Sequence, residues 1–111
     1  MGRPLVYVKL SREVGRRSNL EPMFKYVGNM HGNEAIGRQL LIYLAEFLAR
    51  HYDRDNRVAN LLNNTEIFLL PSLNPDGYDR ATEGECSGTD KKSGARNEVN
   101  IFLITLLTSI V

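Results

Sequence analysis

Apolar residues recur along the chain with two different periods, which predict both strands and helices. Short runs rich in β-branched and aromatic residues predict strands over Leu5–Leu10, Met23–Gly28 and Glu66–Leu70. The third run is almost continuously apolar and leads directly into Pro71, a pattern typical of a strand covered on both faces.

The segment between the second and third expected strands has the clearest helical pattern. Its apolar residues recur at spacings of three and four, which predicts an amphipathic helix. Glu34 is expected in the first turn and Arg50 and His51 in the last, where the helix dipole favours their charges. A second, short helix is expected over residues 55–62. The apolar stripe of the first helix comprises Ile36, Leu40, Leu41, Leu44, Phe47 and Leu48.

The order of these elements predicts the α/β fold class, with about three to four strands in a sheet and two helices on its faces. Asn74-Pro75-Asp76-Gly77 is predicted to form a turn, because Pro fixes φ and Gly permits a positive φ. The polar stretch from Arg80 to Glu98 has no periodicity and is expected to be a long loop.

The apolar run at residues 101–111 is too short to be a transmembrane helix. As a helix its 11 residues would span roughly 16 Å, about half of a bilayer core of ~30 Å. We expect it to be buried, for example as a strand.

Composition excludes several classes of function. The 111 residues carry 14 Lys and Arg against 13 Asp and Glu, a net charge of +1, so no basic surface for nucleic acid is expected. A single Cys excludes an internal disulfide framework and a zinc site built mainly from thiolates.

No secretory signal is recognisable after Met1, and the sequence predicts no cellular location.

The densest cluster of chemically active residues lies between the second strand and the long helix. His31 and Glu34 are three positions apart there, and imidazole and carboxylate are both good zinc ligands. Spacing alone also fits a solvated His beside a helix-capping Glu, and the sequence leaves that alternative open.

Other candidate residues have ordinary explanations. His51 lies about 20 positions after His31, at the far end of the helix, so it cannot share a metal with it. Cys86 is interpreted as a free thiol, Asp76 as a turn residue and Arg96 as a solvated loop cation. Asn63-Asn64-Thr65 matches the glycosylation sequon, which matters only in a secreted chain.

Two long blocks of the sequence resemble the zinc metallocarboxypeptidases, in particular their N/E-type (regulatory) branch. The first runs from Phe24 through Gly28-Asn29-Met30-His31-Gly32-Asn33-Glu34 to Ala45. The second is Leu70-Pro71-Ser72-Leu73-Asn74-Pro75-Asp76-Gly77-Tyr78. Both blocks occur in the family's order, and the resemblance covers about residues 2 to 100. It implies the N-terminal part of a mixed-sheet metallocarboxypeptidase domain.

The resemblance implies an exopeptidase that removes one C-terminal residue, typically Lys or Arg, from peptides and proteins. His31 and Glu34 match the first two zinc ligands of the family, and Arg96 matches an Arg that stabilises the oxyanion. The expected cofactor is Zn²⁺, and the expected partners are peptide or protein C-termini. The family works in the secretory pathway and outside cells.

The match to the family pattern stops at about Ile101. The third zinc ligand, the clamp for the substrate carboxylate and the general-base Glu lie beyond that point in the family and are absent from this chain. We therefore expect residues 1–100 to be a partial, truncated catalytic domain and residues 101–111 a divergent apolar tail. The chain is expected to be inactive alone. The alternative is a non-catalytic fragment or interaction module with residual or no zinc binding.

Overall fold

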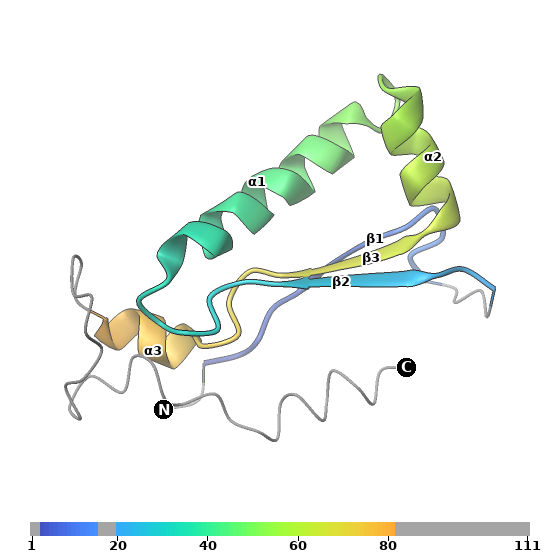
Figure 1. Ribbon diagram of the computed structural model, residues 1–111. Helices are drawn as coiled ribbons and strands as arrows, with labels where there is room; N and C mark the ends of the chain where they lie inside the picture. The colour runs from blue at the N-terminus through green and yellow to red at the C-terminus, as the bar shows by residue number, and fades with distance from the viewer. Residues whose placement is uncertain (1–2, 16–19, 82–111) are drawn as a thin grey trace.

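The computed structural model describes residues 3–15 and 20–81 of the chain. These residues form three strands and three helices, in the order β1 (Val8–Leu10), β2 (Met23–Val27), α1 (Ala35–His51), α2 (Asn56–Asn64), β3 (Glu66–Leu70) and α3 (Pro75–Arg80). Helices α1 and α2 lie over the same face of the sheet, and α3 lies at the opposite end of the sheet from α2 (Figure 1). The α/β class predicted from the sequence is confirmed.

The three strands form one mixed sheet in the order β1-β3-β2. β3 pairs antiparallel with β1 and parallel with β2, so β3 is the central strand. Four of its five side chains are buried, and Phe68 is partly buried. β1 is shorter than the predicted Leu5–Leu10, because only Val8, Lys9 and Leu10 pair with residues of β3.

The core lies between the sheet and the two helices. Ile67 and Leu69 of β3 face α1 and α2, because alternate residues of a strand point to the same side. The other buried members of this cluster are Leu41 and Leu48 of α1 and Val58 and Leu62 of α2.

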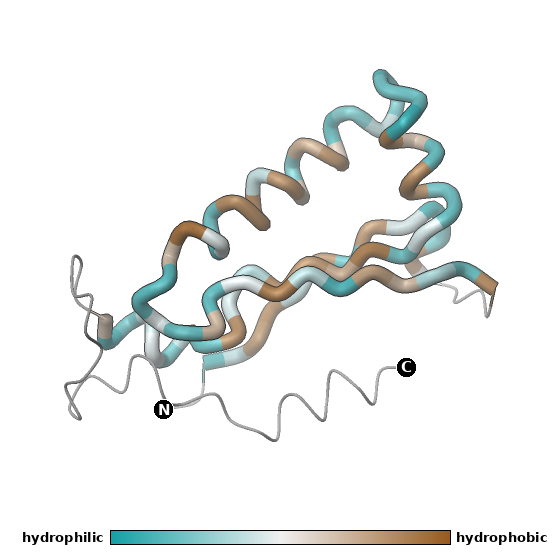
Figure 2. The backbone as a smooth tube through the Cα atoms, in the orientation of Figure 1, coloured by the Kyte–Doolittle hydropathy of each residue, from teal (hydrophilic) through white to brown (hydrophobic). Residues whose placement is uncertain are grey.

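Helix α1 is apolar on two faces, and the sheet covers only one of them. Leu41 and Leu48 are buried, whereas Ile36, Leu40 and Phe47 of the predicted stripe are exposed. Brown, hydrophobic positions recur along the length of α1 (Figure 2). We call the exposed set the outer stripe of α1: Ile36, Leu40, Tyr43 and Phe47.

The turn predicted at residues 74–77 is wrong, because these residues begin helix α3. Asn74 caps the helix by accepting a hydrogen bond from Gly77 N to its Oδ1 at 2.9 Å. Pro75 occupies the first helical position, where its fixed φ suits a helix and its missing N–H costs nothing. The same residues that favour a turn also favour a helix start.

Some sequence predictions fall outside the described residues. These are most of the polar loop from Arg80 to Glu98, the apolar tail at 101–111, and the residues Cys86 and Arg96. Among the residues that are described, no helix is long and apolar enough to cross a membrane.

Candidate metal centre

The loop that carries the candidate metal ligands follows β2 at the carboxyl edge of the parallel strand pair. Gly28 N donates to Leu70 O at 2.9 Å, which continues the pairing of β2 with β3 by one step. Leu73 N then donates to Gly28 O at 3.1 Å, so the segments that leave the two strands remain side by side. Ligand sites of α/β sheets usually form at this edge.

His31 and Glu34 lie in direct contact in this loop. His31 Nδ1 and Glu34 Oε1 are 2.9 Å apart, and the two side chains are 33% and 55% exposed. The carboxylate can only accept, so Nδ1–H donates in this pair. The structure therefore holds both donor groups together at a surface that solvent reaches.

The placement of Glu34 corrects the expectation that it lies in the first turn of the helix. Glu34 is the N-cap residue before Ala35, and its side chain makes no capping hydrogen bond. Its carboxylate contacts His31 instead. The capping part of the alternative is therefore wrong, whereas a partly solvated His31 agrees with its exposed fraction of 33%.

The donor atoms of this pair fit zinc as two of its ligands. Zinc accepts imidazole nitrogen and carboxylate oxygen at about 2.0–2.2 Å, and two atoms 2.9 Å apart can both reach one ion at those lengths. Within residues 3–15 and 20–81, no group of three or more His, Cys, Asp or Glu side chains forms a further metal cluster.

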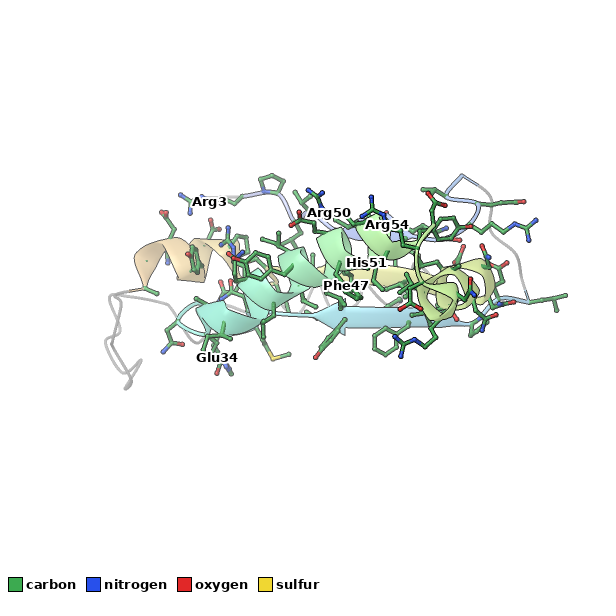
Figure 3. All side chains as sticks on the ribbon, turned by 90° about the horizontal axis from the view of Figure 1, so that it is seen from above. Arg3, Glu34, Phe47, Arg50, His51 and Arg54 are labelled. Carbon is green, nitrogen blue, oxygen red and sulfur yellow. The ribbon has the colours of Figure 1, made fainter. Side chains whose placement is uncertain are left out.

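The other His lies at the far end of α1, as predicted. His51 is the last residue of the helix, and its ring stacks on Phe47 with centroids 4.1 Å apart. Its Nδ1 donates to Phe47 O at 2.8 Å. Glu34 and His51 mark the two ends of α1 in Figure 3.

Buried polar residues around the loop were missed by sequence reasoning. Asn29 and Asn74 are 3% and 2% exposed and lie in the two neighbouring segments. Arg38 of α1 lies over the ring of Tyr78, 4.1 Å from its centroid, and connects α1 with α3. The sequence offered only one sign of these two asparagines, namely a short polar side chain near the end of a strand. Such a side chain can be either buried or solvated, so the sign does not predict burial.

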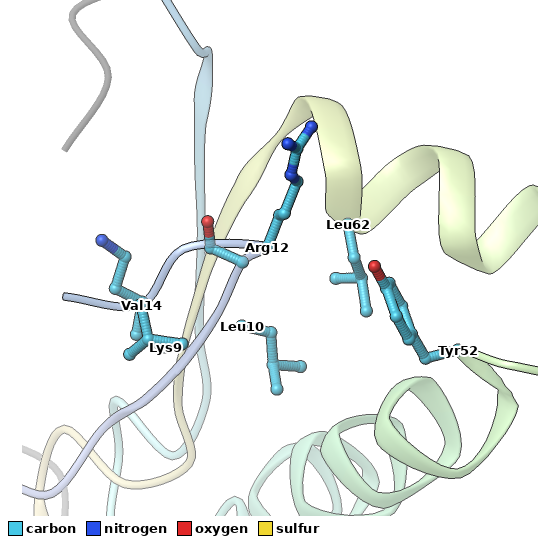
Figure 4. Close-up of a pocket in the computed structure, with 7 residues that line it drawn as sticks. Lys9, Leu10, Arg12, Val14, Tyr52 and Leu62 are labelled. Atoms are coloured by element: carbon cyan, nitrogen blue, oxygen red, sulfur yellow. The ribbon is translucent and has the colours of Figure 1, made fainter. Parts of the chain in front are cut away.

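A pocket lies at the other end of the sheet, near the start of β3 (Figure 4). Its volume of about 200 Å³ is below the ~300–1,000 Å³ typical of small-molecule sites. None of the predicted site residues lines it, so the pair at His31 remains the candidate site. The lining residues are Lys9, Leu10, Ser11, Arg12, Val14, Tyr52 and Leu62.

Known proteins resemble this chain over nearly its whole length. The model of the zinc carboxypeptidase family matches residues 1–101. Carboxypeptidase D of Drosophila melanogaster is 42% identical over 102 residues, which are 92% of this chain and 7% of that protein. Carboxypeptidase Z of Homo sapiens is 44% identical over 103 residues, which are 92% of this chain and 16% of that protein.

A solved structure shares the fold. The crystal structure of thrombin activatable fibrinolysis inhibitor (TAFI) superposes with a TM-score of 0.58 at 25% sequence identity, over 69% of this chain and 18% of the other. The chain thus spans less than a fifth of the length of each of these relatives. The family match, the two relatives and the shared fold together show that this chain belongs to the zinc carboxypeptidase family.

Proposed function

We propose that this chain provides the first two ligands of a zinc carboxypeptidase centre, His31 and Glu34. The observation that supports this role is the contact between His31 Nδ1 and Glu34 Oε1 at 2.9 Å in the loop after β2. Such a metal supplies a Lewis acid and an activated water for hydrolysis of a peptide bond. The substrate class is the C-terminal end of peptides and proteins.

Each of the two residues has a distinct task. His31 would hold the metal through the lone pair of a neutral imidazole nitrogen. Glu34 contributes a negative charge that offsets part of the charge of the metal. Because the two side chains already touch, little further ordering would be needed for both to hold one ion.

The finer assignment is that released residues are basic, Lys or Arg. Its support is the resemblance of the sequence to the N/E-type branch of the family. Arg96, outside the described residues, is proposed on the same ground to stabilise the oxyanion of the transition state.

We further propose that this polypeptide binds zinc weakly and is inactive alone. Catalytic zinc sites take three protein ligands, and the described residues bring two candidates together. A hydrolytic centre also needs a group that accepts the proton of the water. The chain is therefore expected to require further ligands before it can hydrolyse a peptide.

Zinc titration of the full chain by calorimetry tests the ligand assignment. We expect one zinc per chain, and binding at least tenfold weaker in His31→Ala and in Glu34→Gln. His51→Ala is the matched control, because it removes the other histidine at the far end of α1 and should leave binding unchanged. Equal binding by the wild type and His31→Ala would contradict the assignment.

An assay on two peptides that differ only in a C-terminal Arg or Leu tests the proposed activity. With zinc present, we expect the chain alone to release neither residue. Release of Arg that is abolished by His31→Ala would refute inactivity and support basic specificity. Release of Leu in preference to Arg would refute that specificity.

A second candidate function is that of a non-catalytic interaction module. The outer stripe of α1 favours it, because its four large apolar side chains are exposed at helical spacing. Phe24 and Tyr26 of β2 are also about half exposed. Light scattering of the wild type and of Leu40→Lys tests this candidate. Association that the Lys variant abolishes, together with no zinc binding, would favour the module over the metal centre.

A further inference from the structure

Asn29 has an unusual backbone and a buried side chain. Its φ is 51°, in the left-handed region that non-glycine residues rarely adopt and that Asn tolerates best. The residue is only 3% exposed, although its side chain is an amide. A buried amide is costly unless its hydrogen-bonding groups are satisfied, so its contacts require an explanation.

The amide nitrogen of Asn29 binds the backbone of the metal-ligand loop at three points. Nδ2 lies 2.9 Å from His31 O, 3.0 Å from Gly32 O and 3.3 Å from Glu34 O. Carbonyl oxygens only accept, so the amide orientation follows from these three neighbours. One side chain thus fixes the backbone of both candidate ligands and of the glycine that follows the first.

The other side of Asn29 is attached to the segment after β3. Ser72 Oγ donates to Asn29 Oδ1 at 2.6 Å. Asn74 N donates to the backbone oxygen of Asn29 at 3.0 Å, and Asn74 in turn caps α3. The ligand loop is therefore anchored on Ser72 and Asn74, in the segment between β3 and α3.

We propose that Asn29 is the positioning residue of the metal-ligand pair: it orders the loop so that His31 and Glu34 meet before a metal binds. This inference rests on the proposed function, in which these two residues bind zinc. The reason is entropic. A loop held by three hydrogen bonds from one buried amide has already lost the freedom that binding would otherwise have to remove.

Asn29→Gly is the decisive variant, because Gly accepts a φ of 51° and deletes only the side chain. Ser72→Ala removes the hydrogen bond to Asn29 Oδ1 but leaves the three contacts of Nδ2, so it should have a smaller effect. Tyr52→Phe is the control for general destabilisation, because it removes a hydrogen bond to Asn63 at the other end of α1. Circular dichroism establishes that every variant is folded under the conditions used.

Two measurements on the full chain test the proposal. The first is the dissociation constant for Zn²⁺, which we expect to rise at least tenfold in Asn29→Gly, less in Ser72→Ala and not at all in Tyr52→Phe. The second needs no metal. It is the hydrogen exchange of the Glu34 amide, which donates to His31 O at 3.0 Å and should exchange at least tenfold faster in Asn29→Gly.

The outcomes separate this inference from the proposed function. If the wild type and Asn29→Gly bind zinc equally, the positioning role is overturned and the ligand assignment stands. If the wild type does not bind zinc but exchange still distinguishes the two proteins, the ligand assignment fails and the ordering of the loop by Asn29 stands. If Tyr52→Phe matches Asn29→Gly in both measurements, the effect is general destabilisation and the inference is overturned.

Discussion

Gly32 and Gly77 lie in contact, with no room for a side chain between them. A Cβ atom on Gly32 would lie 2.1 Å from the carbonyl carbon of Gly77 and 2.4 Å from its oxygen. Both neighbours are backbone atoms of α3, which cannot rotate away as the end of a side chain could. The loop with the candidate zinc ligands therefore packs backbone against backbone on α3.

Gly32→Ala is expected to destabilise the fold because the loop must move away from α3. The cost of forcing a methyl group into a packed contact is about 1–3 kcal/mol. Urea unfolding monitored by circular dichroism measures it. Gly15→Ala is the matched control, because no atom lies within 4 Å of a Cβ at Gly15. Equal midpoints for the two variants would show that the contact with α3 is not tight in solution.

Lys9 and Glu66 form an ion pair on the sheet, and Glu66 is buried. Lys9 Nζ and Glu66 Oε1 are 2.7 Å apart, and the side chains are 17% and 1% exposed. Lys9→Met leaves a buried carboxylate without this cation and should lower the free energy of unfolding by about 3 kcal/mol. Glu66→Gln should cost less, because the amide is neutral.

A double-mutant cycle measures the interaction free energy between Lys9 and Glu66 separately from the effect of each single substitution. We expect Lys9→Met combined with Glu66→Leu to be more stable than Lys9→Met alone, because the uncompensated buried charge is gone. Additive losses in urea unfolding would contradict an interaction between the two side chains.

Asp55 makes the stability of α2 dependent on pH. Hydrogen bonds from the side chain and the backbone N–H of Arg57 lower the pKa of Asp55 from 3.8 to about 2. A depressed pKa in the folded state favours folding when the carboxylate is charged. This contribution is complete above pH 3.8 and is lost as the pH falls through about 2.

Comparing thermal midpoints of the wild type and Asp55→Asn between pH 6 and pH 2 isolates this effect. Asn is also a good N-cap, so the variant keeps the cap and loses only the charge. We expect the two midpoints to converge as the pH approaches 2. Asp53→Asn is the control for removing a neighbouring charge. A constant difference across the whole range would disprove the pKa shift.

Tyr52 connects the end of α1 with the end of α2. Its hydroxyl donates to Asn63 Oδ1 at 2.7 Å. Tyr52→Phe should lower the free energy of unfolding by about 1 kcal/mol, the usual net value of one hydrogen bond. Tyr43→Phe, at an exposed residue of the same helix, should have no effect. Chemical denaturation of both variants distinguishes the two sites.

The sequence predicted the central elements of the fold accurately because their patterns are local. Glu66–Leu70 is observed with the predicted bounds, since its apolar run has no competing period. The long helix also ends at His51 as expected. What the pattern did not decide is which face of that helix packs on the sheet. Ile36 and Leu41 are both apolar, and only the position of the sheet makes the second one core.

By itself the sequence determined the α/β class and the family resemblance, because both depend on local patterns. It also named His31 and Glu34 as a candidate pair, through the resemblance and not through their spacing alone. Tertiary structure decided the rest of the site. Asn29 and Ser72 are 43 positions apart, and parallel pairing of β2 and β3 brings them to 2.6 Å. No local pattern predicts that contact. It depends on the pairing of β2 with β3, which is stabilised by burial of the two strands.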